Sequence, residues 1–416
     1  MNTEKRISRA PITMSRIPRI ALFVLVAVVL VVSVAVAAVT NSVTIQSYGV
    51  IGMREITAAS GSRSDIQAAV NWMSAVGGGT VYIPAGTFSF NDETVSIPGG
   101  VNVIGAGSEQ TILKSVKPAP FAVMFELNGV NGKPTRISGI GFQGLVTSGS
   151  ANAGWAIYVA WGINFRIDNN TFVDFPGHAI TVGSYQSTYT QPRGVIDHNS
   201  FDNPYKITYG GVWGYGIVLQ GPIPINTPWN AEIADIKNFL GKYETAPTSV
   251  PVVYAEDNIF RRQRHSPDSN QGGWFVSRNN VYDGGQYVYP VGDHAGSRGM
   301  EVYNNIIDAR DPMPYPTGEK RAIGFRGGGG VAFGNVIRNA DTGVRFVWEV
   351  EPNPQKEPQN IWLWNNTLEN TPQYIENLAG LVENVDYFLR APNQAQDGFT
   401  YTPYPYPHPL TLVQNP

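Results

Sequence analysis

Ionisable side chains concentrate in the central part of the sequence. Two of the five histidines of the chain lie there, together with several arginines and an Asp–His dipeptide. The residues of this central cluster that could do chemistry are His265, Asp293, His294, Arg298 and Arg326. A neutral imidazole can accept a proton, and a guanidinium can stabilise a developing negative charge. We therefore predict that these five side chains converge on one exposed face and act as a catalytic group.

A base beside several cations suits the β-elimination of an acidic polysaccharide. In such a lyase a cation neutralises the uronate carboxylate, and a base removes the adjacent proton. Arg264, Arg298 and Arg326 could supply the cation. His265 or His294 could be the base, because a neighbouring arginine lowers the proton affinity of an imidazole.

Hydrolysis of a glycoside needs a different set of groups, namely two carboxylates held several ångströms apart. Asp268, Asp293 and Glu301 are available, but no pair among them stands out. The sequence therefore ranks lyase chemistry above hydrolysis.

Substrate-binding candidates flank the cluster: Arg264, Glu301, Trp274, Tyr287 and Tyr289. Sugar rings pack on aromatic faces, although ordinary packing at turns explains such aromatic residues equally well. No residue pattern indicates a metal site, so the cofactor stays open, with calcium considered but not supported by a motif.

A repeated unit positions these groups. Seven asparagines recur at 22 to 31 residues, apart from one double-length gap: Asn170, Asn199, Asn258, Asn280, Asn305, Asn335 and Asn366. A large apolar residue follows each by two positions, and β-branched and aromatic residues alternate around it, which is typical of short strands and turns. We expect a parallel β-solenoid whose coils lie about 4.8 Å apart. Each asparagine should occupy a turn and bond from coil to coil.

These repeats, and the stretch GGGTVYIPAGTF…VSIPGGVNVIGAG, resemble the right-handed parallel β-helix proteins of the pectin-lyase-like superfamily. The resemblance covers roughly residues 45 to 390 and implies an all-β, single-stranded right-handed parallel β-helix. That scaffold carries lyases, hydrolases, esterases, adhesins and phage tailspikes, so it implies no particular chemistry. The motifs RH, DH, GxRGxE and RGG also resemble sequences of other β-helix proteins. None of these motifs is a defined catalytic signature, so the resemblance implies no catalytic role for their residues. Arginine and aspartate at solenoid turns often form ion pairs, which is the structural alternative for each cluster residue.

Several segments lie outside the regular repeats. A helix from Asp65 to Val76, with Ser64 as N-cap, should cover the open first coil. Residues 221–251 should be an insertion that carries a short helix within a single coil of the 40–390 β-helix. The Pro- and Tyr-rich tail 391–416 should pack along the last coil.

The N-terminus combines a basic segment, residues 1–19, with an uncharged apolar run, residues 20–39. That length and flank predict a transmembrane anchor with a cytoplasmic N-terminus. A cleaved signal peptide is the alternative, because Ala35-Val36-Ala37 offers a cleavage site. Both interpretations place the folded part outside the cytoplasm, at the cell surface or in the extracellular space, with the membrane-anchored form favoured.

Composition limits the partners. The net charge of −3 gives no basic field, which argues against nucleic acid as a partner, and the absence of cysteine excludes disulfides and thiolate chemistry. The expected partner is a polysaccharide or cell-surface glycan. Two hypotheses remain: a polysaccharide lyase-like enzyme outside the cytoplasm, or a non-catalytic, membrane-tethered surface or envelope protein that binds glycans. The apolar segment 20–39 favours the second, because degradative enzymes are usually released.

Overall fold

The computed structural model describes residues 54–412 with internal gaps. The gaps are residue 92 and segments 117–121, 130–131, 147–153, 185–190, 205–213, 223–235, 243–245, 247–248, 286–289, 294–295, 313–319 and 349–356. The chain divides into two units, 1–53 and 54–416, and the described residues all belong to the second. The apolar run 20–39 lies outside them. Within the described ranges, no helix is long and apolar enough to cross a membrane.

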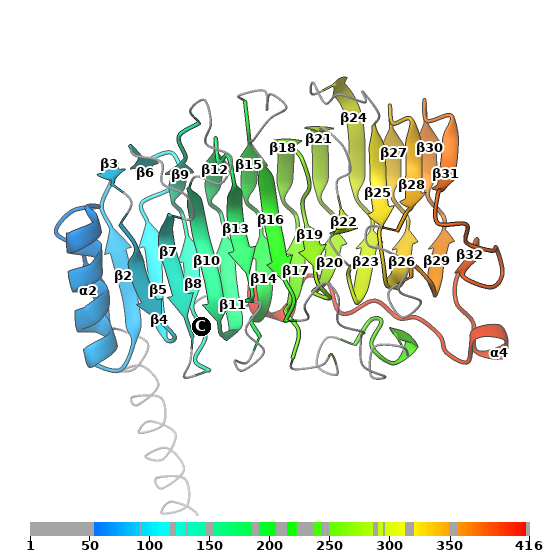
Figure 1. Cartoon of the computed structure of the whole chain (residues 1–416). Helices are drawn as coiled ribbons and strands as arrows, with labels where there is room; N and C mark the ends of the chain where they lie inside the picture. Colours follow the sequence, from blue (N-terminus) through cyan, green and yellow to red (C-terminus); the bar gives the residue numbers. More distant parts are fainter. Residues whose placement is uncertain are drawn as a thin grey trace, which may run out of the picture. The chain divides into compact units, whose positions relative to one another are not determined.

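Three parallel sheets build the described chain (Figure 1). Sheet A consists of β1 (Glu55–Thr57), β2 (Gly79–Ile83), β5 (Val101–Gly105), β8 (Arg136–Ser138), β11 (Ile163–Asp168), β14 (Arg193–Asp197), β17 (Val252–Glu256), β20 (Trp274–Arg278), β23 (Gly299–Tyr303), β26 (Gly329–Phe333), β29 (Ile361–Trp364) and β32 (Tyr387–Phe388).

Sheet B consists of β3 (Gly86–Phe90), β6 (Thr111–Ser115), β9 (Gly141–Gln143), β12 (Thr171–Val173), β15 (Ser200–Asp202), β18 (Ile259–Gln263), β21 (Val281–Gly285), β24 (Ile306–Pro312), β27 (Val336–Arg338) and β30 (Thr367–Glu369). Sheet C consists of β4 (Val95–Pro98), β7 (Val123–Asn128), β10 (Trp155–Trp161), β13 (His178–Val182), β16 (Tyr215–Gln220), β19 (Asp268–Asn270), β22 (Val291–Asp293), β25 (Arg321–Phe325), β28 (Thr342–Phe346) and β31 (Gln373–Asn377). The chain visits the sheets in the order A, B, C, and strands of successive coils pair in parallel, as the repeats predicted.

The asparagine ladder is confirmed. The backbone N and Nδ2 of Asn258 both donate to Oδ1 of Asn280, at 2.9 and 3.1 Å. Asn280 donates to Asn305 in the same way, and the ladder runs through all seven predicted positions: Asn170, Asn199, Asn258, Asn280, Asn305, Asn335 and Asn366. The left-handed turn falls one residue earlier, for example at Asp257 (φ 57°) and Asn279 (φ 55°), because the ladder asparagine itself turns into the core.

The residues two positions after these asparagines stack inside the coil, as the repeat predicted. The rings of Phe172, Phe201, Phe260 and Tyr282 follow one another with centroids 4.8 to 4.9 Å apart. This spacing matches the strand separation, so each coil adds one ring to a continuous apolar core.

The capping helix is confirmed, with a correction at its start. α2 spans Arg63–Ala75 and packs on β2 and β4 of the first coils, at the blue end of Figure 1. Its N-cap is Ser62 and not Ser64, because the Ser62 hydroxyl accepts the bond from the Asp65 backbone N–H. The apolar face of α2 covers the open coil, which the amphipathic pattern predicted.

A second apolar cluster lies outside sheet A. Its buried members include Tyr254, Trp274 and Trp362, and the described part of the insertion and the tail cover them. The insertion belongs to a single coil, as predicted, since β14 pairs directly with β17. Within 221–251 the described residues form one short 3₁₀-helix, η1 (Ile236–Asn238).

The tail differs from the expectation that it packs along the last coil. It contains α4 (Gln394–Asp397) and α5 (Pro409–Leu412), and α5 contacts β14 and β11, far from the end of the solenoid. The tail therefore runs back along the outside of sheet A (red in Figure 1). Arg278 holds it there, donating to the carbonyls of Tyr404 and Pro405 at 2.7 and 2.8 Å.

Candidate functional site

At the start of β13 in sheet C, the side chains do not alternate between the two faces of the sheet as they do in a regular strand. In β13 the consecutive residues Ala179 and Ile180 both belong to the core. The residues on either side, His178 and Thr181, contact each other, with Nδ1 of His178 2.9 Å from Oγ1 of Thr181, and both are buried.

Four rings from successive coils line up at this position, and we call them the ring row: Trp155, His178, Tyr215 and His265. Trp155 stacks on His178 with centroids 5.1 Å apart, and His178 meets Tyr215 edge to face at 5.3 Å. His265 stacks on the other side of Tyr215 at 5.2 Å. The guanidinium of Arg264 lies 5.5 Å from the centre of the Tyr215 ring. An imidazole and a cation thus lie beside one aromatic ring.

Burial fixes the charge state of the first histidine in the row. His178 is buried, and this lowers its pKa to about 3, so the ring is neutral near pH 7. His265 is also buried, with 0% of its surface exposed. The amino end of sheet C therefore combines buried rings with the guanidinium of Arg264.

A second polar group lies at the carboxyl end of the same sheet, beside the backbone of Asp293, and we call it the carboxyl-end cluster: Gln220, Asn270, Arg298 and Arg326. Gln220, Asn270 and Asp293 are register partners in β16, β19 and β22. The backbone N of Arg326 donates to the carbonyl of Gly292, which places Arg326 next in this row.

Arg298 joins this cluster at the corner that leads back to sheet A. Its backbone N donates to the carbonyl of Gly273, and its side chain crosses Gly272, where a Cβ would lie 3.2 Å from Cγ of Arg298. Oε1 of Gln220 and Oδ1 of Asn270 are buried and accept no hydrogen bond within the described part of the chain. These two carbonyl oxygens are acceptors that a hydroxyl-rich ligand would satisfy.

The structure does not bring all the predicted catalytic residues to one point. Arg298, Arg326 and the strand residue Asp293 lie together, whereas His265 lies at the opposite end of sheet C. Four residues lie between His265 and Asn270, and His265 precedes strand β19 whereas Asn270 ends it. His294 lies outside the described residues. The ring row and the carboxyl-end cluster lie on the same sheet but at opposite ends of its strands. They can therefore act on one ligand only if that ligand is long enough to reach both.

Two predicted substrate-binding residues lie on another face altogether. Glu301 and Trp274 belong to sheet A and are buried under the insertion and the tail. Oε1 of Glu301 accepts a bond from the backbone N of Gly241, and Oε2 accepts one from the Tyr401 hydroxyl, both at 2.7 Å. Burial raises the pKa of Glu301 to about 7. Glu301 and Trp274 hold the insertion and the tail on sheet A. Their spacing in the sequence could not distinguish this structural role from substrate binding. Tyr287 and Tyr289 lie outside the described residues.

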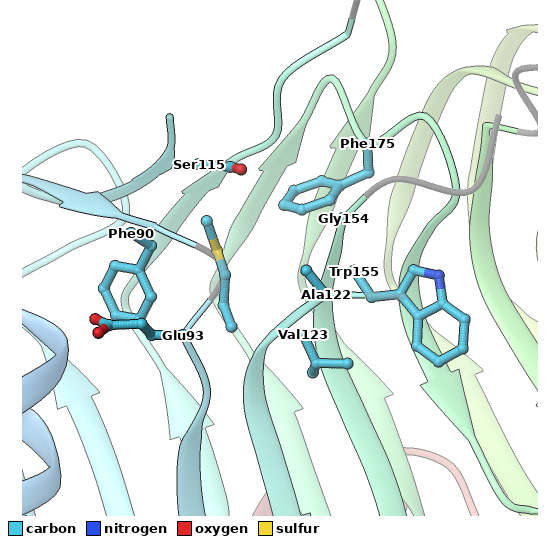
Figure 2. Close-up of a pocket in the computed structure, with 9 residues that line it drawn as sticks. Phe90, Glu93, Ser115, Ala122, Val123, Gly154, Trp155 and Phe175 are labelled. Atoms are coloured by element: carbon cyan, nitrogen blue, oxygen red, sulfur yellow. The ribbon is translucent and has the colours of Figure 1, made fainter. Parts of the chain in front are cut away.

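A hollow opens beside the first residue of the ring row (Figure 2). It lies where strands of sheet B end and strands of sheet C begin, and its cavity volume of about 10 Å³ has room for about one water molecule. Its lining residues are Phe90, Glu93, Ser115, Ala122, Val123, Met124, Gly154, Trp155 and Phe175. Trp155 belongs both to this hollow and to the ring row.

Metal binding finds no support in the described residues. No three histidine, cysteine, aspartate or glutamate side chains among them lie close enough to hold an ion. Asp268, a candidate carboxylate for hydrolysis, is buried next to Ser269 in β19, with Val218 of β16 as its register partner.

Comparison with known proteins concerns the fold. No protein-family model and no curated protein matches the chain. The tailspike protein of the E. coli bacteriophage HK620, solved in complex with a pentasaccharide, aligns with a TM-score of 0.51 at 15% identity, over 82% of this chain and 60% of the tailspike. The chain is a parallel β-helix.

Two further β-helix structures align less closely. An alginate lyase from Paenibacillus sp. str. FPU-7 gives a TM-score of 0.49 at 14% identity, over 78% of this chain and 98% of the lyase. The A-module of a mannuronan C-5 epimerase from Azotobacter vinelandii gives 0.43 at 14% identity, over 78% and 72%. The three parallel sheets and the tailspike alignment confirm the expected resemblance to β-helix proteins for the fold, and none of these likenesses assigns an activity.

Of the ring row, only His265 was predicted from the sequence, although a signal for the other three rings exists. Three sheet C strands begin with a ring, a small residue and isoleucine: Trp155-Ala156-Ile157, His178-Ala179-Ile180 and Tyr215-Gly216-Ile217. His265-Ser266-Pro267 continues the pattern with proline in the third place. In β10 and β13 the second and third residues both belong to the core, which sets the ring apart from the regular alternation of a strand. Gln220 and Asn270 carry no comparable signal, because only strand register aligns them.

Proposed function

We propose that this β-helix binds an acidic glycan along the outer face of sheet C and cleaves it by β-elimination. The observation that carries the proposal is the ring of Tyr215, which has the imidazole of His265 stacked at 5.2 Å and the guanidinium of Arg264 at 5.5 Å. A base and a cation on one aromatic platform are the groups that this reaction requires. The tailspike with the same fold was solved with a bound pentasaccharide, which favours a glycan as the ligand class.

Each group has a defined part in the proposed reaction. Arg264 pairs with the uronate carboxylate and stabilises the negative charge that develops next to it. His265 accepts the proton from the carbon beside that carboxylate. The electron pair of this C–H bond forms a C=C bond, the glycosidic C–O bond breaks, and the departing oxygen takes a proton from water.

The carboxyl-end cluster would hold the rest of the glycan. Arg298 and Arg326 suit carboxylates of neighbouring sugar residues, since guanidinium groups pair with carboxylates in a bidentate way. The buried carbonyl oxygens of Gln220 and Asn270 would accept bonds from sugar hydroxyls. The distance between this cluster and His265 requires an extended ligand.

Incubation with polyuronates tests the proposed activity. The purified full-length protein is mixed with alginate, pectate and a glucuronan, and ultraviolet absorbance of unsaturated uronate is followed. The proposal expects absorbance to rise with at least one polymer and to be lost in Arg264→Gln. Absence of both cleavage and binding with all of these polymers would refute an acidic glycan as the ligand.

A non-catalytic glycan-binding protein is the second candidate. The burial of His265 (0% exposed) and Arg298 (3% exposed) favours it, because a base that acts on a substrate must reach it. Calorimetric binding of an oligouronate without any unsaturated product would select this alternative.

The location of the protein is a separate proposal. The basic segment 1–19 and the apolar run 20–39 support a membrane-anchored protein whose β-helix lies outside the cytoplasm. Such a location would expose sheet C to surface or environmental glycans.

A further inference from the structure

We propose that the last coil of the solenoid, at the orange end in Figure 1, is a dimer interface that packs on the last coil of a second copy of this chain. This coil contains β30, β31 and β32, each the final strand of its sheet. We call the surface formed by these three strands and residues 378–389 the end face. The proposed function does not involve this surface, so the two proposals are independent.

Four aliphatic side chains of the end face are strongly exposed: Leu378 (59%), Val382 (56%), Val385 (64%) and Leu389 (44%). Large apolar side chains that gather on a surface mark an interaction site, because their burial is favourable. Apolar residues of the same coil that pack on the core are themselves only partly buried: Leu368, Ile375 and Leu381. The core of the solenoid therefore reaches the surface at this end.

The two ends of the solenoid differ in this respect. At the first coil, α2 covers the core with its buried residues Ile66, Val70 and Met73. A solenoid end without such a cover exposes both core residues and strand edges. At the last coil the chain continues as the tail, which runs along sheet A and not over the end face.

The terminal segments of the chain join the solenoid far from the end face. α5 contacts β14, which is six strands from β32 in sheet A, or about 29 Å. The four residues after α5 span at most about 14 Å, so the C-terminus cannot cover the end face. Residues 1–53 join the solenoid at β1, eleven strands from β32, or about 53 Å. We therefore expect a partner to cover the end face.

The chemistry of the end face favours a protein partner over lipid. Strand edges present backbone N–H and C=O groups, which hydrocarbon cannot satisfy. The carboxylate of Glu383, exposed between Val382 and Val385, also opposes insertion into a bilayer. Nε2 of Gln373 already donates to the carbonyl of Ile375 at 2.9 Å, so the contact depends more on the aliphatic side chains than on a continuous sheet.

Two further carboxylates of the last coil are paired within one copy and would not repel another. Glu369 bonds to Arg338 at 2.6 Å. Glu376 bonds to Arg321 at 2.7 Å and lies 3.2 Å from Arg345. These arginines belong to earlier coils, so both carboxylates are held towards the body of the solenoid.

A second copy matches the end face under two-fold rotation, because it presents the same three strands and the same aliphatic residues. Two-fold contacts of this kind are the commonest in oligomers, and they close the assembly at two subunits. A head-to-tail contact with α2 fits less well, because α2 exposes the polar residues Asn71 and Ser74 beside Trp72.

Sedimentation equilibrium of the full-length protein in detergent micelles tests the dimer. Val382→Arg and Val385→Arg are compared with the parent. Leu412→Arg is the matched control, since Leu412 is 68% exposed but lies in α5, outside the end face. The parent and the control should be dimers, and each end-face variant should raise the dissociation constant at least about tenfold. Thermal melting checks that every variant is folded.

Thiol labelling determines which surfaces meet, because the chain contains no cysteine of its own. Val385→Cys and Trp72→Cys each introduce one thiol, at opposite ends of the solenoid. A water-soluble maleimide should label Val385→Cys more slowly as the protein concentration rises, whereas labelling of Trp72→Cys should not depend on concentration.

Four results would overturn the inference. A parent protein that stays monomeric up to its solubility limit has no such interface, and a dimer unaffected by the end-face variants forms elsewhere. Concentration-dependent protection of Trp72→Cys, with masses above the dimer, would show a head-to-tail assembly. Loss of the dimer on deletion of residues 1–39 would assign the association to the apolar run 20–39. The polyuronate assay is independent of all four results.

Discussion

The imidazole of His265 stacks on the phenol ring of Tyr215 in the preceding coil, with centroids 5.2 Å apart and planes inclined by 25°. This contact joins a proton acceptor from one coil to an aromatic residue from another, and both rings are buried. It also brings Arg264, the residue before His265, over the same ring. The proposed chemistry depends on this arrangement.

Replacing the candidate base should remove activity without unfolding the protein. His265→Gln keeps a side chain of similar volume but removes the proton acceptor, so polyuronate cleavage should fall by about 10²- to 10⁴-fold. The control is His198→Gln, because the His198 side chain is 52% exposed and bonds to Asp197 at the end of sheet A. Ultraviolet assays and thermal melting check both variants. Equal activity in His265→Gln and the parent would exclude His265 as the base.

The ion pair of Arg278 and Glu256 should be a major determinant of stability. Both side chains are fully buried, with Nη2 and Oε2 2.6 Å apart, and Arg278 also holds the tail. Arg278→Met leaves a buried carboxylate without its cation, so the free energy of unfolding should fall by about 3–5 kcal/mol.

The matched control for that pair is Arg338→Met, since Arg338 and Glu369 form an ion pair whose side chains are 40% and 50% exposed. This substitution should cost about 0–1 kcal/mol. Urea denaturation measures both variants. Similar losses from the two substitutions would show that burial of the Arg278 pair does not determine its contribution.

Glu301 should make stability depend on pH in a defined window. Its pKa is raised from 4.5 to about 7, so the folded protein holds a proton that the unfolded chain releases between these values. Stability from this group is therefore full below about pH 4.5 and falls as pH rises to about 7, by up to about 3 kcal/mol. Glu301→Gln removes the ionisation and should gain stability relative to the parent at pH 8 but not at pH 4.5. Urea denaturation at the two pH values measures the difference, and a pH-independent difference would contradict the assigned pKa.

The N-terminal segment predicts membrane association. Full-length protein should sediment with membranes, and a variant that lacks residues 1–39 should be recovered in the soluble fraction. Fractionation followed by N-terminal sequencing decides the question. A mature protein that begins near Ala38 and stays soluble would show that the segment is a cleaved signal peptide.

The fold was predictable because its determinants repeat in the sequence. Asn258, Asn280 and Asn305 keep the same relation to a strand in every coil, so their spacing predicted both the solenoid and the ladder. The N-cap was placed two residues too late because Ser62 and Ser64 have the same chemistry. Only the backbone geometry at Ser62 distinguishes them.

The candidate site was only partly predictable, because loops of unequal length separate strands from the next ladder position. His265 and Arg298 were predicted to converge, yet His265 precedes strand β19 of sheet C and Arg298 follows strand β22. Glu301 looked like a neighbour of Arg298, but it lies on sheet A under Tyr401. The tail that covers it comes from 100 residues further along the chain, a contact that no local pattern reports.

The location of the bound glycan is the most direct test of the central claim. A crystal structure of the full-length protein with the tightest-binding oligosaccharide from the titrations would measure it. Our account predicts that the sugar chain lies along the outer face of sheet C, with an acidic residue beside Arg264 and Tyr215. A sugar chain bound on the outside of sheet A or sheet B, with sheet C unoccupied, would contradict it.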